Sequence, residues 1–170
     1  QTRDLIRRLN LAAITVLNNK GNILPLHSDK EMPPMALLEV GDAGETDVLA
    51  KQLEKHTSLV RFRLHKEMTE AQGKVLRDSL SKYRRVIVAV AEQRLAPFQP
   101  FFAALAADKK AAPAIYVFFT PGKMMLQIHR AVSAAQSVVL AHSVGHDVQQ
   151  QVADVLFARA SADGRLSASL

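Results

Sequence analysis

Among the carboxylates of this sequence, Glu92 is the best placed for chemistry. It directly follows the apolar run "RVIVAVA" at residues 85–91, and such a run predicts a strand buried on both faces of a sheet. Groups that face a ligand gather at the carboxyl ends of parallel strands, where a carboxylate can act as a general acid or bind a sugar hydroxyl. The alternative, which we favour, is a solvated loop residue paired with Arg94. Glycosidic hydrolysis by the usual route needs two carboxylates, so Glu92 alone does not provide it.

Two histidines, His142 and His146 in "HSVGH", have a spacing of four residues that suits a metal when both lie on one helix. Here the intervening residues 143–145 have the composition of a loop after a strand, and no third ligand is evident. We therefore predict no metal site and no cofactor, and interpret both histidines as polar loop residues. His142 and Arg94 remain candidate substrate contacts.

The loop "GDAGET" at residues 41–46 is the candidate anion site, because a glycine-bearing loop that enters a helix can hold a phosphate. It lacks the full G-x-G-x-x-G pattern, and Asp42 and Glu45 would repel an anion. A simple strand-to-helix turn is the favoured interpretation. A serine-hydrolase G-x-S-x-G is absent from the sequence. Three phenylalanines could line a ligand but are expected in the core: Phe98, Phe101 and Phe102.

The composition is that of an ordinary globular domain, with 170 residues, 48% of them apolar, and a net charge of +6. No apolar run approaches the roughly 20 residues that span a bilayer, so we expect no membrane insertion. The chain has no cysteine, which excludes disulfides and cysteine-ligated metals. Its basic residues are scattered and its aromatic residues few, so a nucleic-acid partner is not expected. Because the chain begins at Gln1 and not with methionine, we expect the natural protein to be longer.

Strands and helices must alternate to position these residues. Apolar runs or strict alternation predict strands at 14–17, 35–40, 58–65, 85–91, 114–119 and 137–143. Helical periodicity and capping signals predict helices at 3–13, 47–56 (with Thr46 as N-cap), from the capping box 69–72 onward, 98–108, 123–131 and 147–159. The alternating strand 58–65 is expected near a sheet edge. This order predicts an α/β fold, a three-layer α/β/α sandwich around a mainly parallel five- or six-stranded sheet.

Both ends of the chain carry motifs that resemble the C-terminal domain of glycoside hydrolase family three. In that family a helix leads into an apolar strand, then an L-x-N sequence, a glycine-bearing turn and "LPL". The residues that match at the start are Leu17, Asn18 or Asn19, Gly21, Leu24, Pro25 and Leu26. The residues that match at the end are Ala153, Leu156, Phe157, Gly164, Arg165, Leu166, Ser169 and Leu170. Residues 116–125 resemble the family's strand-and-turn segment.

The sequence departs from the family pattern at three places. Ala158 replaces a usual glycine, Ser167 replaces a usual proline, and Thr120-Pro121-Gly122 replaces a usual Gly-Asn-Pro order. These departures concern turns and the loops that would face an active site. They leave the expected fold unchanged.

The resemblance implies that residues 1–170 are one C-terminal domain of a larger retaining exo-β-glycosidase, either a β-N-acetylhexosaminidase or a β-glucosidase. A (β/α) barrel before Gln1 would carry the nucleophilic Asp, and this chain would pack on it and wall its carbohydrate pocket. In the β-N-acetylglucosaminidase branch an Asp-His pair of the barrel does the acid/base work. In the β-glucosidase branch a C-terminal-domain Glu does it, and Glu92 is the candidate here. The short loops resemble the first branch more closely.

Four further expectations accompany this interpretation. The isolated chain should be inactive, and the resemblance is consistent with an extracytoplasmic parent, either periplasmic or secreted. Residues 14–26 would be where chain from the barrel joins the sandwich, and the tail "GRLSASL" would close the sandwich.

The alternative function is that of a free-standing flavodoxin-like module that binds a small anion or nucleotide.

Overall fold

The fold is seen in a computed structural model that describes residues 14–28 and 33–157. The predicted helix 3–13 and the C-terminal tail lie outside these residues. Within them a six-stranded sheet has the order β1-β6-β5-β4-β2-β3. The strands are β1 (Thr15–Asn19), β2 (Met35–Val40), β3 (Leu59–Leu64), β4 (Val86–Val90), β5 (Ala114–Phe118) and β6 (Ser137–Leu140). All neighbours are parallel except β1, which pairs antiparallel with β6. The predicted fold class is confirmed.

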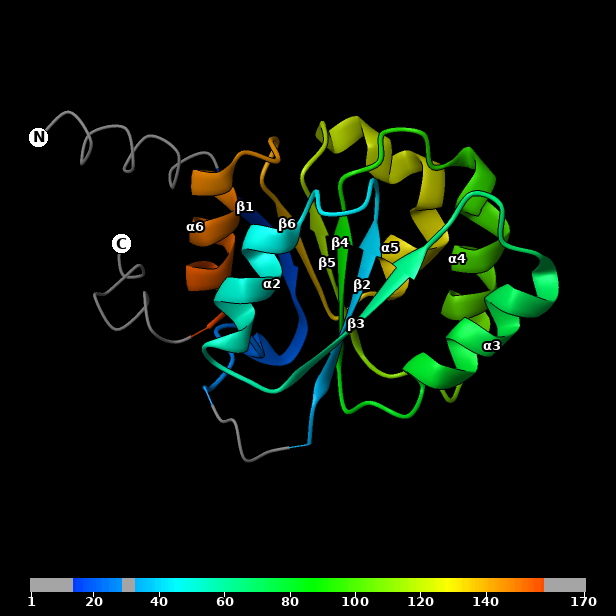
Figure 1. Cartoon of the computed structure of the whole chain (residues 1–170), viewed down its shortest axis with the longest axis horizontal. Coiled ribbons are helices and arrows are strands. Elements are labelled where there is room, and N and C mark those ends of the chain that lie inside the picture. Colours follow the sequence, from blue (N-terminus) through cyan, green and yellow to red (C-terminus); the bar gives the residue numbers. More distant parts are fainter. Residues whose placement is uncertain (1–13, 29–32, 158–170) are drawn as a thin grey trace, which may run out of the picture.

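Helices cover both faces of the sheet (Figure 1). The α-helices are α2 (Asp47–Glu54), α3 (Glu70–Leu80), α4 (Gln99–Ala107), α5 (His129–Ala134) and α6 (His146–Leu156). The described residues also form three 3₁₀ segments: η1 (Lys20–Asn22), η2 (Ala96–Phe98) and η3 (Gly122–Ile128). In Figure 1, α2 and α6 lie on one side of the sheet, and α3, α4 and α5 lie on the other. No helix in this described part of the chain is long and apolar enough to cross a membrane.

Two hydrophobic cores result from the alternation of side chains along the buried strands. In β4, Val86, Val88 and Val90 enter the core beneath α3, α4 and α5, whereas Ile87 and Ala89 enter the core beneath α2 and α6. All five residues of β4 are at most 3% exposed. The continuous apolar run therefore forms a central parallel strand buried on both faces, as predicted. Phe98 and Phe102 are core residues, as predicted, and Phe101 is half-buried against the same core.

The helices differ from the prediction mainly at their ends. The predicted helix 98–108 is entered through η2, where Pro97 lies, and ends at Ala107. The predicted helix 123–131 is mostly the 3₁₀ segment η3, followed by the short α5. The capping box of α3 is confirmed, since Thr69 Oγ1 accepts from Gln72 N and Gln72 Oε1 accepts from Thr69 N.

Thr46 has the predicted N-cap position of α2 but not the predicted role. Its side chain makes no cap hydrogen bond. Instead its hydroxyl donates to Glu39 Oε2 at 2.5 Å. The backbone N–H of Leu49, in the first turn of α2, is satisfied by Gln149 from α6 at 2.9 Å. The hydroxyl proton of Thr46 is given to this carboxylate, and the acceptor for the Leu49 N–H comes from another helix.

The segment at residues 14–26 is fastened to the sandwich at two points. Asn19 Oδ1 accepts from the N–H of Leu24 at 3.0 Å, and Asn19 Nδ2 donates to the carbonyl of Leu24 at 3.2 Å. Leu26 N then donates to the carbonyl of Leu156 at 2.6 Å, beside the bridge between Leu26 and Phe157. The Asn and "LPL" positions of the resemblance therefore join the start of the described chain to the end of α6. That a barrel precedes this junction stays a prediction.

Candidate functional site at the carboxyl edge of the sheet

The carboxyl ends of the five parallel strands meet at one edge, the upper one in Figure 1. Backbone bonds join the residues that follow them: Ala91 N donates to Val40 O, Phe119 N to Val90 O, and Ala141 N to Phe118 O, each at 2.8–2.9 Å. This register brings the loops after β2, β4, β5 and β6 to a common rim. The rim is the place where a fold of this type presents ligand-facing groups, and it includes every site residue predicted from the sequence.

Glu92 lies on this rim, but its carboxylate is held within its own loop. Oε2 accepts from the backbone N–H of Arg94 at 3.0 Å, and Oε1 is 3.7 Å from Lys66 Nζ. The side chain is 18% exposed. The predicted pairing of Glu92 with Arg94 therefore involves the backbone of Arg94, and the ionic partner is Lys66. A carboxylate used in this way orders the turn after β4.

Arg94 and His142 are both exposed on the rim. Among the described residues, the Arg94 side chain has no hydrogen bond or ion pair, so it is available to a ligand. His142 directly follows Ala141 at the end of β6 and has a φ of 65°, a left-handed conformation that is uncommon for a residue other than glycine. This backbone turn carries the chain from β6 toward α6.

His142 and His146 do not share a helix, because His146 is the first residue of α6 and His142 lies in the preceding loop. The spacing of four residues therefore does not place the two histidines on one helix face, as a shared metal would require. Within residues 14–28 and 33–157, no group of three or more His, Cys, Asp or Glu side chains could hold a metal ion.

The loop at residues 41–46 is already filled by its own groups. The N–H of Asp42 donates to Glu45 Oε1 at 3.0 Å. A methyl group added at Gly41 would lie 2.7 Å from that same Glu45 oxygen and 3.1 Å from Ala91 Cβ, so the carboxylate is packed tightly on the loop. Since Glu45 occupies a backbone amide that an anion would need, the geometry favours the simple turn over the phosphate site.

Gln149 is the polar residue that the sequence reasoning missed. It is fully buried in α6 and makes three hydrogen bonds. Its Oε1 accepts from Leu49 N at 2.9 Å, and its Nε2 donates to the carbonyls of Glu45 at 2.9 Å and Val144 at 2.7 Å. The residue therefore ties the loop after β2, the start of α2 and the loop after β6 together beneath the rim. Val155, later in the same helix, is only half-buried.

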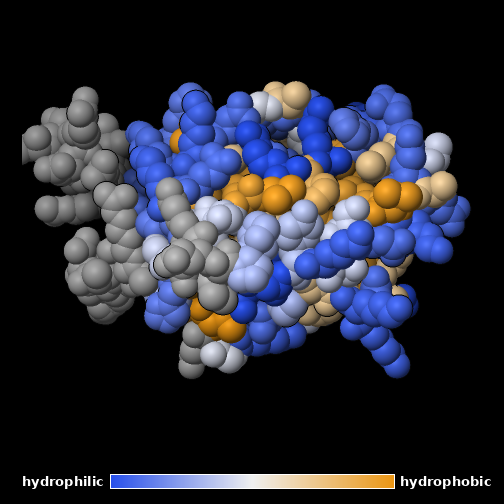
Figure 2. All heavy atoms as spheres, turned by 60° about the horizontal axis from the view of Figure 1, so that its bottom comes forward, coloured by the Kyte–Doolittle hydropathy of each residue, from blue (hydrophilic) through white to orange (hydrophobic). Residues whose placement is uncertain are grey.

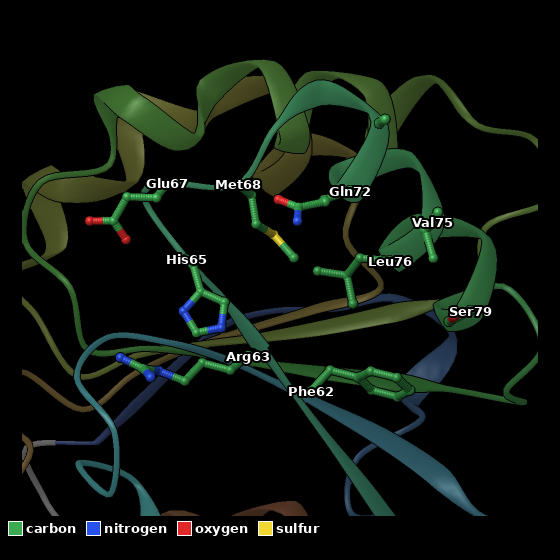
Figure 3. A pocket seen from close by; sticks show the side chains of 10 residues that line it. Phe62, Arg63, His65, Glu67, Met68, Gln72, Val75, Leu76 and Ser79 are labelled. Carbon is green, nitrogen blue, oxygen red and sulfur yellow. The ribbon is translucent and has the colours of Figure 1, made fainter.

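Two grooves border α3 near this rim. The first, which we call the β3/α3 groove, has a volume of about 720 Å³ and runs between the edge strand β3 and α3. Figure 3 shows Phe62, Met68 and Leu76 bordering the hollow, with Arg63 and His65 to one side. Arg63 Nε donates to the carbonyl of Gly41 at 3.1 Å, so this cation already has a partner.

The second, which we call the α3/α4 groove, has a volume of about 360 Å³ and opens between α3 and the segment formed by η2 and α4. The two grooves share His65 and Met68. Seen from below the view of Figure 1, the surface also carries an apolar band between hydrophilic flanks (Figure 2).

Solved structures confirm the resemblance at the level of the fold. The chain matches a fungal multi-domain GH3 β-N-acetylglucosaminidase with a TM-score of 0.70 and 15% identity, over 89% of this chain and 17% of that one. A glycoside hydrolase family 3 β-N-acetylglucosaminidase from Paenibacillus sp. str. FPU-7 matches with a TM-score of 0.65 and 19% identity, over 90% and 30%. A β-glucosidase from Listeria innocua matches with a TM-score of 0.66 and 12% identity, over 88% and 24%.

The chain thus spans between 17% and 30% of the length of these three enzymes. No family model matches this sequence, and no curated protein matches it by sequence. The comparison therefore rests on the fold, and it agrees with the motifs at the two ends of the chain.

Proposed function

We propose that this chain, whose fold is that of a part of family three glycoside hydrolases, is the C-terminal accessory domain of a retaining exo-β-glycosidase of the β-N-acetylhexosaminidase or β-glucosidase type. It packs on a catalytic (β/α) barrel of the same polypeptide and walls the carbohydrate pocket. The observation that carries this proposal is the nearly complete match of the chain to a minor part of several such enzymes.

The rim supports the proposal in two ways. The carboxylate of Glu92 is already paired with Arg94 N and Lys66, and a single carboxylate does not supply the two roles that glycoside hydrolysis requires. Leu126, in η3 after β5, is 74% exposed, and an exposed large apolar side chain beside polar ones suits a surface that meets another domain. The rim would then contribute contacts to a sugar, with Arg94 and His142 as candidates.

The isolated chain is expected to show no turnover of an aryl β-N-acetylglucosaminide or an aryl β-glucoside, because Glu92, the one candidate carboxylate, cannot supply both catalytic roles. The parent polypeptide is expected to hydrolyse one of the two. The measurement compares purified chain and purified parent at equal molar concentration. The upstream gene should encode about 350 residues with a barrel pattern, which is a rough length for that fold. Hydrolysis by the purified chain alone, or a parent without a barrel, would refute the proposal.

Glu92→Gln in the parent is expected to change kcat/KM by less than about threefold, since the carboxylate is held by Arg94 N and Lys66 and lies in its own turn. Glutamine keeps an acceptor for the Arg94 N–H, so the loop should persist. Loss of a general acid would instead lower kcat by about a hundredfold or more. That larger loss would assign Glu92 the acid/base role of the β-glucosidase branch. The matched control is Glu67→Gln, which removes an exposed carboxylate close to the same rim.

A further inference from the structure

The amino edge of the sheet, the lower one in Figure 1, gathers basic side chains that are scattered along the sequence. The segments at this edge lie between each α-helix and the next strand, together with η1, whose Lys20 N donates to the carbonyl of Gln136 just before β6 at 2.8 Å. In the described chain these segments carry the cations Lys20, Lys55, Lys82, Arg84, Arg85, Lys109 and Lys110, which we call the basic edge. Their one described carboxylate, Asp108, accepts from the backbone N–H of Lys110 at 2.9 Å.

The opposite edge, the rim, has the reverse balance of charge. The described segments between each strand and the next α-helix carry more carboxylates than cations: Asp42, Glu45, Glu67 and Glu92 against Lys66, Arg94 and Lys123. The charge of the described chain is therefore polarised along the strand direction, with its positive end at the amino edge. A field of this kind draws anions to one end of a molecule.

The cations of the basic edge are not neutralised within the domain. None of them forms an ion pair with the described residues. Arg84 donates to neutral oxygens, the carbonyl of Pro33 at 2.8 Å and the hydroxyl of Thr57 at 3.4 Å. Burial and the positive charge of Arg84 lower the pKa of Arg85, so these two neighbouring cations repel each other. An anionic partner would relieve that repulsion, since an opposite charge favours the charged form.

The basic edge is too wide for one small anion. Lys20 follows β1 and Lys55 precedes β3, and these two strands are the opposite ends of the sheet. Neighbouring strands lie about 4.8 Å apart, so this edge is roughly 24 Å wide. It also has depth, because Lys55 follows α2 on one face of the sheet, whereas Lys82 and Lys109 follow α3 and α4 on the other (Figure 1). The cations therefore form a two-dimensional patch, which suits a plane of anionic groups better than a single extended polymer.

We propose that the basic edge binds the surface of an anionic lipid bilayer, with headgroup phosphates against its lysines and arginines and without insertion into the hydrocarbon. Each basic residue near such a surface strengthens adsorption by about fivefold. The rim lies at the other end of the strands and faces away from the bilayer, so its groups stay accessible. This inference goes beyond the proposed function and does not depend on it.

The test is co-sedimentation of the 170-residue chain with vesicles of phosphatidylcholine, alone or mixed with an equal amount of phosphatidylglycerol. We expect binding at least about tenfold tighter to the anionic vesicles. It should be lost between about 0.1 M and about 1 M salt, where the Debye length falls from about 10 Å to about 3 Å. Equal binding to both vesicles, or binding that salt does not weaken, would overturn the proposal.

Two polymers test the assignment to a lipid surface. Heparin and double-stranded DNA are compared with the anionic vesicles at equal concentrations of negative charge. We expect both polymers to bind more weakly than the vesicles, because the patch extends over both faces of the sheet. Tighter binding of either polymer would assign the basic edge to a polymeric anion and contradict the proposal.

A pair of double variants locates the contact. Lys109→Gln/Lys110→Gln removes two cations of the basic edge and should weaken vesicle binding by about tenfold or more. The matched control, Lys74→Gln/Lys123→Gln, removes the same charge outside that edge and should change binding by less than about threefold. All four side chains are exposed and none forms an ion pair with the described residues, so both variants should fold. Equal weakening in the two variants would show that net charge, and not the basic edge, attracts the chain to the vesicles.

Discussion

Replacing Gln149 with leucine is expected to lower the free energy of unfolding by about 3 kcal/mol, because each buried polar group left without a partner costs about 1–3 kcal/mol. The substitution keeps the volume and adds apolar surface, which offsets part of the loss. It removes the acceptor for the Leu49 N–H and the donor for the carbonyls of Glu45 and Val144. Three backbone groups beneath the rim then lose the side chain that joins them.

The measurement is urea unfolding followed by circular dichroism. The matched control is Gln150→Leu, one residue farther along α6, whose side chain is exposed; surface substitutions of this kind usually change stability by less than about 0.5 kcal/mol. Equal midpoints for the two variants would show that Gln149 does not hold α2 and α6 together. We also expect faster amide hydrogen exchange at Leu49 in Gln149→Leu, since the first turn of α2 loses its acceptor.

The role of Gln149 could not be predicted from the local pattern. A glutamine between apolar helix positions is ordinarily assigned to the solvent face, since glutamine is mostly exposed. Its partner Leu49 is 100 residues away in the sequence. The N-cap residue of α2, Thr46, makes no cap hydrogen bond and donates its hydroxyl to Glu39, and no local sequence pattern indicates this. Only the packing of α6 against α2 shows which residue supplies the missing acceptor.

The strands could be predicted because the pattern of apolar residues that identifies each strand lies within its own few residues. The apolar runs at β4 and β5 predict buried parallel strands, and the alternation in β3 predicts an edge strand. The sheet order confirms both, since β4 and β5 lie inside the sheet and β3 lies at its edge. The position of β1 was not predictable in this way. It is the first strand in sequence but pairs antiparallel with β6, the last, and such a pairing depends on contacts between distant segments.

The sequence indicated where the candidate residues lie on the sheet, but not whether their side chains are free or already paired. Glu92, Arg94 and His142 follow strand ends, so the parallel sheet brings them to one rim, as the sequence implied. Whether a rim side chain is free or already paired depends on its neighbours across the sheet. Lys66 reaches Glu92 from the end of β3, and no spacing in the sequence relates these two residues.

Glu39 is a carboxylate within the buried strand β2, and it is held there by a cation from the neighbouring strand. Arg61 donates from Nε and from an NH2 group to the two oxygens of Glu39 at 2.8 and 2.7 Å, and also to Asp47 at 2.6 Å. Arg61 lies opposite Leu37 and diagonal to Glu39 in the parallel register. The hydrogen bond to Glu39 raises the pKa of Arg61, although burial opposes the shift. Because the pKa is raised, the contribution is complete at neutral pH and is lost only above the usual arginine range.

Arg61→Met is therefore expected to destabilise the chain by about 2–3 kcal/mol, somewhat less than the 3–5 kcal/mol typical of a fully buried pair, because Arg61 is 38% exposed. The variant keeps the apolar stem and leaves the carboxylate of Glu39, only 13% exposed, without its cation. Arg63→Met is the matched control on the same strand and removes the same charge. Arg63 is exposed and makes one hydrogen bond, to the carbonyl of Gly41, so its loss should cost less than about 1 kcal/mol, as is usual for surface substitutions.

The double variant Glu39→Met/Arg61→Met separates the two possible causes of that loss. If the cost in Arg61→Met comes from a carboxylate stranded in the sheet, removing the carboxylate as well should restore at least half of the lost stability, because an apolar pair of similar volume is often as stable as a buried ion pair. If the cost comes instead from the lost hydrogen bond between Arg61 and Asp47, the double variant should be no more stable than Arg61→Met. Urea unfolding of both variants and of Glu39→Met completes the cycle. A coupling near zero would show that Glu39 and Arg61 act independently, and that the ion pair does not hold β2 to the edge strand.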